Sequence, residues 1–235
     1  YVNIQKMKPE AVISDLKNGS LGQADQRKQA DLLASLNSLH LERLQQDQQL
    51  EASIQAMEMA FRMQFAVPEA FDLSKESKAT LEMYGGSEYA KGCLLARRLA
   101  ERDVRFTQVF IRQWDQHGNL PKDIRRQCGI VDQPCAALLN DLKQRGMLDD
   151  TLVMVTTEFG RTPRVNSSNG RDHWARSYSM LLAGGGITRG QIYGASDATA
   201  SEPAKNPVAL EDFLYTVYHQ LGIDANNELL AFGTR

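Results

Sequence analysis

The chain has 235 residues, a formal net charge of −2 and 42% hydrophobic residues. The balanced charge gives no case for binding nucleic acid or a bulk acidic substrate, and no apolar run approaches the roughly 18 residues that a membrane span needs. The length allows one sizeable core with a helical annex, so the sequence predicts a soluble globular protein.

The first 84 residues are expected to form an irregular start and a helical arm. Residues 1–22 are punctuated by proline and glycine and are predicted to be loop with one short helix. From about Ala24 to Met63, apolar residues recur at three- and four-residue steps, as in a long amphipathic helix. An arm packed on the core is favoured over an interaction platform for a partner. The opening YVNIQKMKPE lacks an initiator methionine and a basic-then-apolar leader, so an internal piece or a processed product is expected.

Residues 85–235 are predicted to form the C-terminal part of an α/β domain. A helix over Ser87–Glu101 leads into a strand at Val104–Ile111, and a helix over Pro121–Lys143 leads into a second, buried strand at Leu152–Val155. A strand, a helix and a strand joined by short connections form the right-handed unit of a parallel sheet. The sequence therefore predicts a parallel sheet with helices packed against it.

Further elements are expected on either side of these strands. Pro134 lacks the amide proton of a mid-helix hydrogen bond, so its helix either restarts or kinks there. A hydrophobic strand is predicted at Tyr178–Ala183, a short strand at Gln191–Tyr193 and a last helix at Val208–Leu221. The three glycines 184–186 match no phosphate-loop motif, so a tight turn is favoured over a phosphate cradle.

Polar side chains follow the ends of two predicted strands. Asp115 and His117 follow the first, and two residues apart on an extended backbone they point to the same side. Aspartate with histidine is a common pair for zinc or another transition metal. Glu158 follows the second strand, with Asp172 and His173 in the polar segment beyond it. Ligands sit beyond the carboxyl ends of parallel strands, so these groups are expected to converge on one divalent-ion site if the strands are neighbours.

Each candidate ligand also has a structural interpretation. For the pair Asp115 and His117, a functional role is favoured because a loop supplies few reasons to hold both. Glu158 is favoured as a ligand or base over a surface carboxylate at a turn. Asp172 and His173 are equally well explained as a satisfied loop pair.

Three arginines lie among these acidic residues. Arg161, Arg164 and Arg171 suit a phosphate or sulfate anion, because guanidinium groups bind such anions through paired hydrogen bonds. They are equally suited to be charge partners for Glu158 and Asp172. The sequence leaves both interpretations open.

The cysteines Cys93, Cys128 and Cys135 are odd in number and lack metal-type spacing. Cys93 lies in an apolar helical pattern. Free buried thiols are therefore favoured over a disulfide.

Several motifs together resemble a known family. WDQHGN, EFGRTP and GRDHW, followed by the LAGGG strand, resemble the domain of unknown function 1501 family, a sulfatase-like group related to alkaline phosphatases. The resemblance extends from AFRMQFAVPEAFDLSKE to VALEDFLYTVYHQLGID and so covers most of the chain. It implies an alkaline-phosphatase-like three-layer α/β sandwich with a mostly parallel sheet, incomplete at the N-terminus. It also implies hydrolysis of phosphate or sulfate esters of small molecules or polysaccharides, with one or two divalent ions such as zinc, calcium or magnesium.

The resemblance assigns roles to individual residues. Asp115 and His117 look like the aspartate and histidine that bind one metal in the superfamily, and His173 looks like the late histidine that returns to it. Glu158 looks like the aspartate that binds the other metal. Phe159 stands where that second motif normally has a histidine, which implies a single-metal site or a weakened second one.

The resemblance also implies that part of the machinery lies elsewhere. In relatives, the first metal-binding aspartate and the nucleophile precede the matched region, so the chain is expected to be the C-terminal part of a longer protein and inactive as a fragment. The full-length protein is expected to be a metal-dependent ester hydrolase, with Arg161 or Arg164 holding the anion. A catalytically silent binding or scaffold protein is the alternative. A periplasmic or exported location is implied by the resemblance alone.

Overall fold

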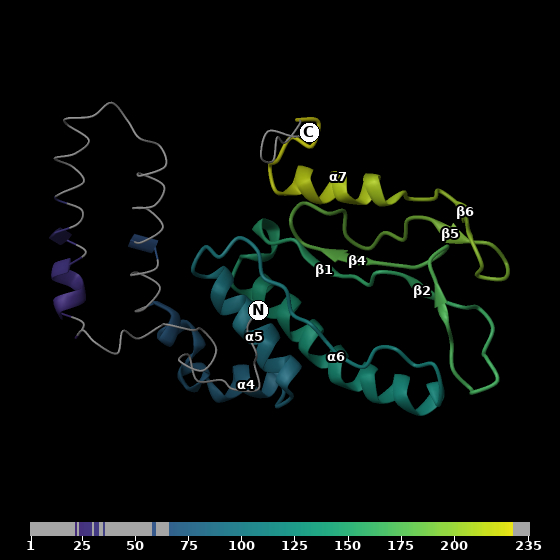
Figure 1. The fold of residues 1–235 in the computed structure, drawn as a ribbon, viewed down its shortest axis with the longest axis horizontal. Coiled ribbons are helices and arrows are strands. Elements are labelled where there is room, and N and C mark those ends of the chain that lie inside the picture. The colour runs from purple at the N-terminus through teal and green to yellow at the C-terminus, as the bar shows by residue number, and fades with distance from the viewer. Residues whose placement is uncertain are drawn as a thin grey trace. The chain divides into compact units, whose positions relative to one another are not determined.

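The computed structural model describes residues 66–227, together with residues 22, 24–29, 31, 32, 35, 58 and 59 (Figure 1). The chain divides into two units, Tyr1–Glu82 with Glu101–Val104, and Met83–Ala100 with Arg105–Arg235. The candidate ligands all belong to the second unit.

Short helices make up the described part of the first unit. Residues 24–29, 31, 32, 35, 58 and 59 are helical, as are residues 66–71. The 3₁₀ helix η2 (Leu73–Lys75) and the helix α4 (Lys78–Tyr84) follow. Asp72 caps η2 by accepting a hydrogen bond of 3.1 Å from the amide of Ser74. Most of the predicted arm over Ala24–Met63 lies outside the described residues, so its packing stays a prediction.

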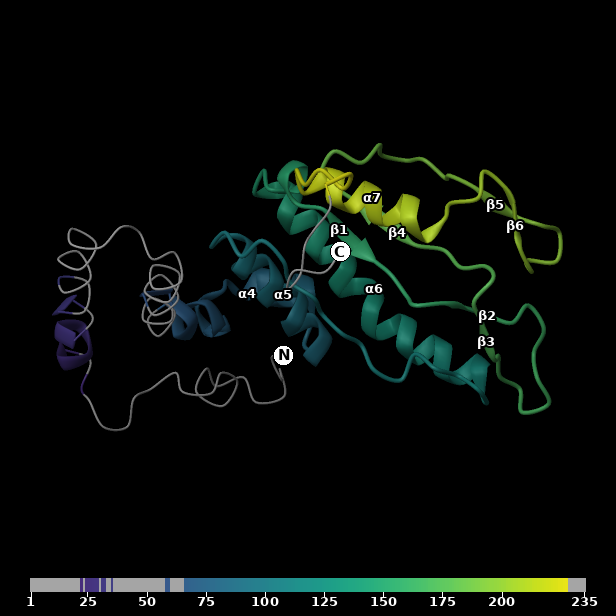
Figure 2. The same ribbon diagram turned by 45° about the horizontal axis from the view of Figure 1, so that its top comes forward.

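Two packed helices form the core of the second unit, α5 (Glu88–Ala100) and α6 (Leu120–Gln144), and both views show them side by side (Figures 1 and 2). Proline near the start of α6 needs no amide partner there, and Gly146 follows its end with a left-handed φ of 71°. The buried apolar residues that the two helices contribute are Ala90, Cys93, Leu94, Leu95, Ala137 and Leu142. Both predicted helices are confirmed, and α6 runs through Pro134 as one element, so the predicted restart does not occur.

A buried polar network ties these helices together. The carboxylate of Asp141 on α6 lies 2.9 Å from Nε of Arg97 on α5 and 2.7 Å from Nε of Arg145. It also accepts a 3.0 Å hydrogen bond from the hydroxyl of Tyr84. Burial, with the Asp141 charge as the second cause, raises the pKa of Tyr84, so the hydroxyl stays a proton donor.

The described strands are short and pair antiparallel. β1 (Val153–Val155) pairs with β4 (Leu181–Ala183), with Met154 opposite Leu182. β2 (Gly160–Arg161) pairs with β3 (His173–Trp174), and β5 (Ala195–Ser196) with β6 (Pro203–Lys205). The result is three two-stranded sheets.

The parallel sheet predicted from the sequence is not observed among the described residues. Strands do form within both predicted segments, 152–155 and 178–183, but Val155 and Leu181 are exposed and neither strand is covered on both faces. The chain reverses between β1 and β4 through residues 156–180, and a strand that returns directly pairs antiparallel, whereas parallel pairing requires a crossover. The described chain is therefore a mixture of helices and a few short antiparallel strands.

Two predicted strands do not form. Val104–Ile111 has no strand hydrogen bonding, and its Phe106 is 70% exposed. Gln191–Tyr193 likewise forms no strand, and Ile192 is 96% exposed. An apolar sequence becomes a strand only where a partner satisfies its backbone, and no described strand pairs with either segment.

The last elements are a glycine turn and a helix. Glycines 184, 185 and 186 all have positive φ, and a Cβ at Gly184 would overlap the carbonyl oxygen of Thr151. The predicted tight turn is therefore confirmed. The predicted last helix is also confirmed, as α7 (Leu210–Gln220). Across the described residues, no helix has the length and hydrophobicity needed to cross a membrane.

Candidate metal centre

Four of the five candidate ligands, Asp115, His117, Asp172 and His173, lie where two loops meet. One loop, residues 113–119, precedes α6, and the other, residues 162–172, connects β2 to β3. We call these the α6 loop and the hairpin loop. The amide of Arg171 donates to the carbonyl of Gln116 over 2.9 Å, and the amide of Leu120 donates to the carbonyl of Asn169 over 2.9 Å. Backbone hydrogen bonds therefore hold the two loops in a fixed register.

Gly170 makes this close approach possible. It is buried, and a Cβ at this position would overlap the carbonyl group of His117. Any other residue would force the two loops apart.

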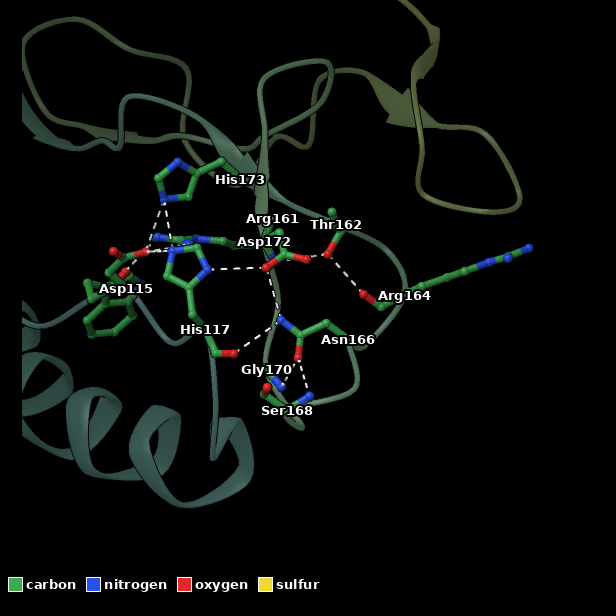
Figure 3. Close-up of polar contacts among 11 residues, drawn as sticks. Asp115, His117, Arg161, Thr162, Arg164, Asn166, Ser168, Gly170, Asp172 and His173 are labelled. Carbon is green, nitrogen blue, oxygen red and sulfur yellow. Dashed lines mark hydrogen bonds and ion pairs between the residues drawn. The ribbon is translucent and has the colours of Figure 1, made fainter.

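Asp115, His117 and His173 bring one ligand atom each to a common point (Figure 3). Asp115 Oδ1 lies 2.9 Å from Nε2 of His117 and 3.2 Å from Nε2 of His173, and the two Nε2 atoms are 3.2 Å apart. The backbone between Asp115 and His117 is not extended as predicted. The amide of His117 donates to the carbonyl of Asp115 over 3.2 Å, and this tight turn brings the two side chains together.

The donor set fits a transition-metal ion. A tetrahedral ion with bonds of about 2.0 Å holds its ligand atoms about 3.3 Å apart, and the three observed separations are 2.9, 3.2 and 3.2 Å. Two imidazoles and one carboxylate also match the three protein ligands of catalytic zinc sites, which leave one position open. Calcium and magnesium prefer oxygen ligands, so the two imidazoles favour zinc or a neighbouring transition metal.

Asp172 does not belong to the three-residue ligand group, but it contacts the ring of His117. Its Oδ1 lies 3.2 Å from Nδ1 of His117, the ring nitrogen that faces away from the common point. The hydrogen bond from Asn166, followed by the one from His117, lowers the pKa of Asp172, so the carboxylate is ionised and accepts a hydrogen bond from Nδ1–H. This contact assigns the Nδ1–H tautomer to His117, which leaves the Nε2 lone pair for an ion.

Arg161 pairs with the acidic ligand. Its Nη1 lies 2.6 Å from Asp115 Oδ1, and its Nη2 donates to the carbonyl of Trp114 over 3.2 Å. The guanidinium is the largest cause of the lowered pKa of Asp115, followed among the favourable contacts by His173. Arg161 therefore lies at the centre, and its partner is Asp115, not the Glu158 or Asp172 considered from the sequence.

Two residues expected at the site lie elsewhere. Glu158 is exposed, does not belong to the ligand group, and accepts a 3.3 Å hydrogen bond from the hydroxyl of Thr157. The same hydroxyl lies 3.2 Å from the carbonyl oxygen of Phe159 and is shared between the two acceptors. The side chain of Arg164 points away from the cluster (Figure 3), and its carbonyl accepts a hydrogen bond of 2.9 Å from Thr162.

Aromatic packing occupies the position where the resemblance implies a further histidine. The ring centroid of Phe159 lies 4.3 Å from that of His173. Phe159 thus supports the ring of a ligand instead of supplying a ligand itself.

A cavity of about 500 Å³ adjoins the ligands. Its lining residues are Gln113, Asp115, Gln116, His117, Gly118, Asp123 and Arg126. Two of the three ligand residues face this space, so a molecule held there would lie beside a bound ion.

Two amide side chains that the sequence patterns did not single out hold the loops in place. Gln127 of α6 is buried and donates to the carbonyls of Arg112 and Gln113, where Gln113 has a left-handed φ of 64°. Asn166 holds the hairpin loop. A turn-forming sequence, NSSNG, surrounds Asn166 and marks the loop, but it does not reveal what the amide contacts.

A family model described as "Protein of unknown function (DUF1501)" matches residues 3–235. No curated protein and no solved structure matches the chain.

Proposed function

Since the chain belongs to the DUF1501 family of proteins of unknown function, we propose that the full-length protein works as a metal-dependent hydrolase of phosphate or sulfate esters with a sulfatase-like, alkaline-phosphatase-like architecture. The observation that carries the proposal is the convergence of Asp115, His117 and His173 on one point beside a cavity. Asp115, His117 and His173 would hold a divalent ion there, and its chemistry would be to polarise an ester oxygen and to stabilise negative charge on the transferring group. The three-layer sandwich is part of this proposal, supported by the resemblance of the motifs.

The residues around the ligands would perform distinct tasks. His117 and His173 would each offer one imidazole nitrogen to the ion, and Asp115 would supply the negative charge of the centre. Arg161 partly neutralises that charge, and its guanidinium is placed to stabilise an anionic group of the substrate. Arg164 points away from the centre, so of the two predicted arginines only Arg161 is proposed to act on substrate.

The cavity would receive the alcohol part of the ester. Amide, carboxylate and guanidinium groups line it, and its charged residues besides the candidate ligand Asp115 are Asp123 and Arg126, which lie 4.0 Å apart. Because these two opposite charges are so close, their electrostatic potentials largely cancel over the rest of the cavity. A polar, uncharged group, as in an ester of a small hydroxylated molecule or a polysaccharide, is therefore the proposed occupant.

Metal reconstitution tests this function. The full-length protein is stripped with a chelator, reloaded with zinc, manganese or magnesium, and assayed with aryl phosphate and aryl sulfate esters. Hydrolysis should return with zinc or another transition metal and should be lost in Asp115→Ala and His173→Ala. Equal activity in these variants and the wild type would remove the assignment.

A second candidate is a catalytically silent binding or scaffold protein. The packing of Phe159 on His173 favours it, because the residue type that would complete a second metal position is absent there. The same experiment separates the two candidates. Stoichiometric metal binding without hydrolysis of either ester class supports the silent protein.

A further inference from the structure

The side chain of Asn166 makes four hydrogen bonds within and between the two loops. Its Oδ1 accepts from the amide of Ser168 over 3.0 Å and from the amide of Gly170 over 2.9 Å. Its Nδ2 donates to Oδ1 of Asp172 over 2.9 Å and to the carbonyl of His117 over 3.1 Å. All four positions of the amide are therefore used (Figure 3).

The orientation of this amide follows from its partners. A backbone N–H can only donate, so the atom that faces Ser168 and Gly170 is the oxygen. The nitrogen then faces two acceptors, the Asp172 carboxylate and the His117 carbonyl. The reverse assignment would set two donors against two donors and two acceptors against two acceptors.

Both donor bonds of Asn166 act on the same histidine. One holds the backbone of His117, and the other holds Asp172, whose Oδ1 in turn faces Nδ1 of the His117 ring. Asn166 thus sets the position of the ring and the position of the carboxylate that orients it. The four partners of Asn166 do not include the ligand atoms of Asp115 or His173.

Only asparagine satisfies this geometry. Aspartate would keep the two acceptor bonds to Ser168 and Gly170, but it has no donor and would place a second negative charge against Asp172. Alanine would lose all four bonds. Glutamine is longer by one methylene, so its amide cannot occupy the same position.

We propose that Asn166 is a positioning residue, which through Asp172 holds His117 as the Nδ1–H tautomer and presents its Nε2 to a metal ion. Loss of a residue that orients a metal-binding histidine typically lowers metal affinity by a factor of about 10–100. The metal-binding part of the inference rests on the proposed function, whereas the tautomer of His117 is a property of the metal-free protein.

The test compares Asn166→Asp and Asn166→Ala with the wild type and with Ser168→Ala. Ser168 contributes its backbone amide to the network, so its alanine variant keeps that bond and serves as the matched control. Zinc affinity is measured by competition with a chromophoric chelator. We expect Asn166→Asp to weaken zinc binding about 10–100-fold and Ser168→Ala to leave it unchanged. Unchanged affinity in Asn166→Asp would overturn the inference.

Nitrogen-15 chemical shifts of the imidazole rings give a second readout that needs no metal. In the stripped wild-type protein, His117 should be protonated at Nδ1 and bare at Nε2 at a pH where it is neutral. In Asn166→Asp, which keeps the turn bonds, the Nε2–H tautomer should appear. If the wild type binds no zinc but shows these tautomers, the proposed function fails and the positioning role stands. If His117 carries its proton on Nε2 in the wild type, the positioning role is overturned.

Discussion

The Nε2 atoms of His117 and His173 lie 3.2 Å apart, although 56 positions separate the two residues in the chain. Nδ1–H of His117 donates a hydrogen bond to Asp172, so its Nε2 has a lone pair directed at the second ring. Two imidazoles in this arrangement require a proton or a cation between them, and the carboxylate of Asp115 beside both favours a cation.

His173→Ala should abolish stable metal binding, because only two of the three proposed ligands, Asp115 and His117, would remain. The expected result is a fall from about one zinc ion per chain to a small fraction after dialysis, measured by elemental analysis. His219→Ala, which changes an exposed histidine on α7, is the matched control and should keep its zinc. Full zinc occupancy in His173→Ala would show that the ion, if bound, lies elsewhere.

Gly170→Ala should disrupt the centre without touching any ligand. The added methyl group would overlap the His117 carbonyl, so the hairpin loop must move away from the α6 loop. We expect zinc affinity to fall at least as far as in the Asn166 variants, by about 10–100-fold, while the circular dichroism of α5 and α6 stays unchanged. Wild-type zinc affinity in Gly170→Ala would mean that the loops adapt more easily than this packing suggests.

The sequence predicted the helices and their approximate bounds because their signals are local. Apolar residues at helical spacing and a proline near the start predicted a helix over residues 121–143. The observed helix α6 spans residues 120–144, so each predicted end is one residue from the observed end. A strand depends on a partner that can lie anywhere in the chain. The run Val104–Ile111 has the composition of a strand, but composition does not say whether a neighbour will pair with it.

The candidate site divides in the same way. The sequence identified Asp115 and His117 as a metal-type pair, because an aspartate and a histidine lie two residues apart. The structure places His173 beside them. Glu158 was selected for its position after a strand, yet it is not among the residues that bring a ligand atom to the common point. The contacts of Asn166 depend on the register of two loops, which no local pattern encodes.

Asp141→Ala should strongly destabilise the second unit. Arg97 is 2% exposed and Asp141 is 3% exposed, so the variant leaves a buried guanidinium without its carboxylate. We expect a loss of about 3–5 kcal/mol in the free energy of unfolding, against about 1.5–3 kcal/mol for Tyr84→Phe, which removes one hydrogen bond to the same carboxylate. Urea unfolding followed by circular dichroism gives both values. Similar small losses in the two variants would indicate that water reaches Arg97.

The three cysteines should differ in their reactivity. Cys128 is exposed on α6, whereas Cys93 is buried, and burial raises the pKa of the Cys93 thiol to about 12. The thiolate is the reactive form, so at pH 8 an alkylating reagent should label Cys128 within minutes and Cys93 only after unfolding. Mass spectrometry of peptides from the wild type and from Cys128→Ser identifies the labelled positions. Rapid labelling of Cys93 in the folded protein would contradict the packing of α5 against α6.

Arg161→Ala should separate metal binding from turnover. The guanidinium lies 2.6 Å from the ligand carboxylate but is not itself a ligand, so its removal takes a positive charge away from a site for a cation. Zinc affinity should therefore stay the same or increase. Hydrolysis of aryl phosphate or aryl sulfate should fall, by about 10²–10³ in kcat if Arg161 stabilises the anion in the transition state. Arg164→Ala, whose side chain points away from the centre, serves as the comparison and should show a much smaller fall. Loss of zinc binding in Arg161→Ala would instead show that the guanidinium holds Asp115 in place, and equal turnover in the two variants would remove Arg161 from the proposed chemistry.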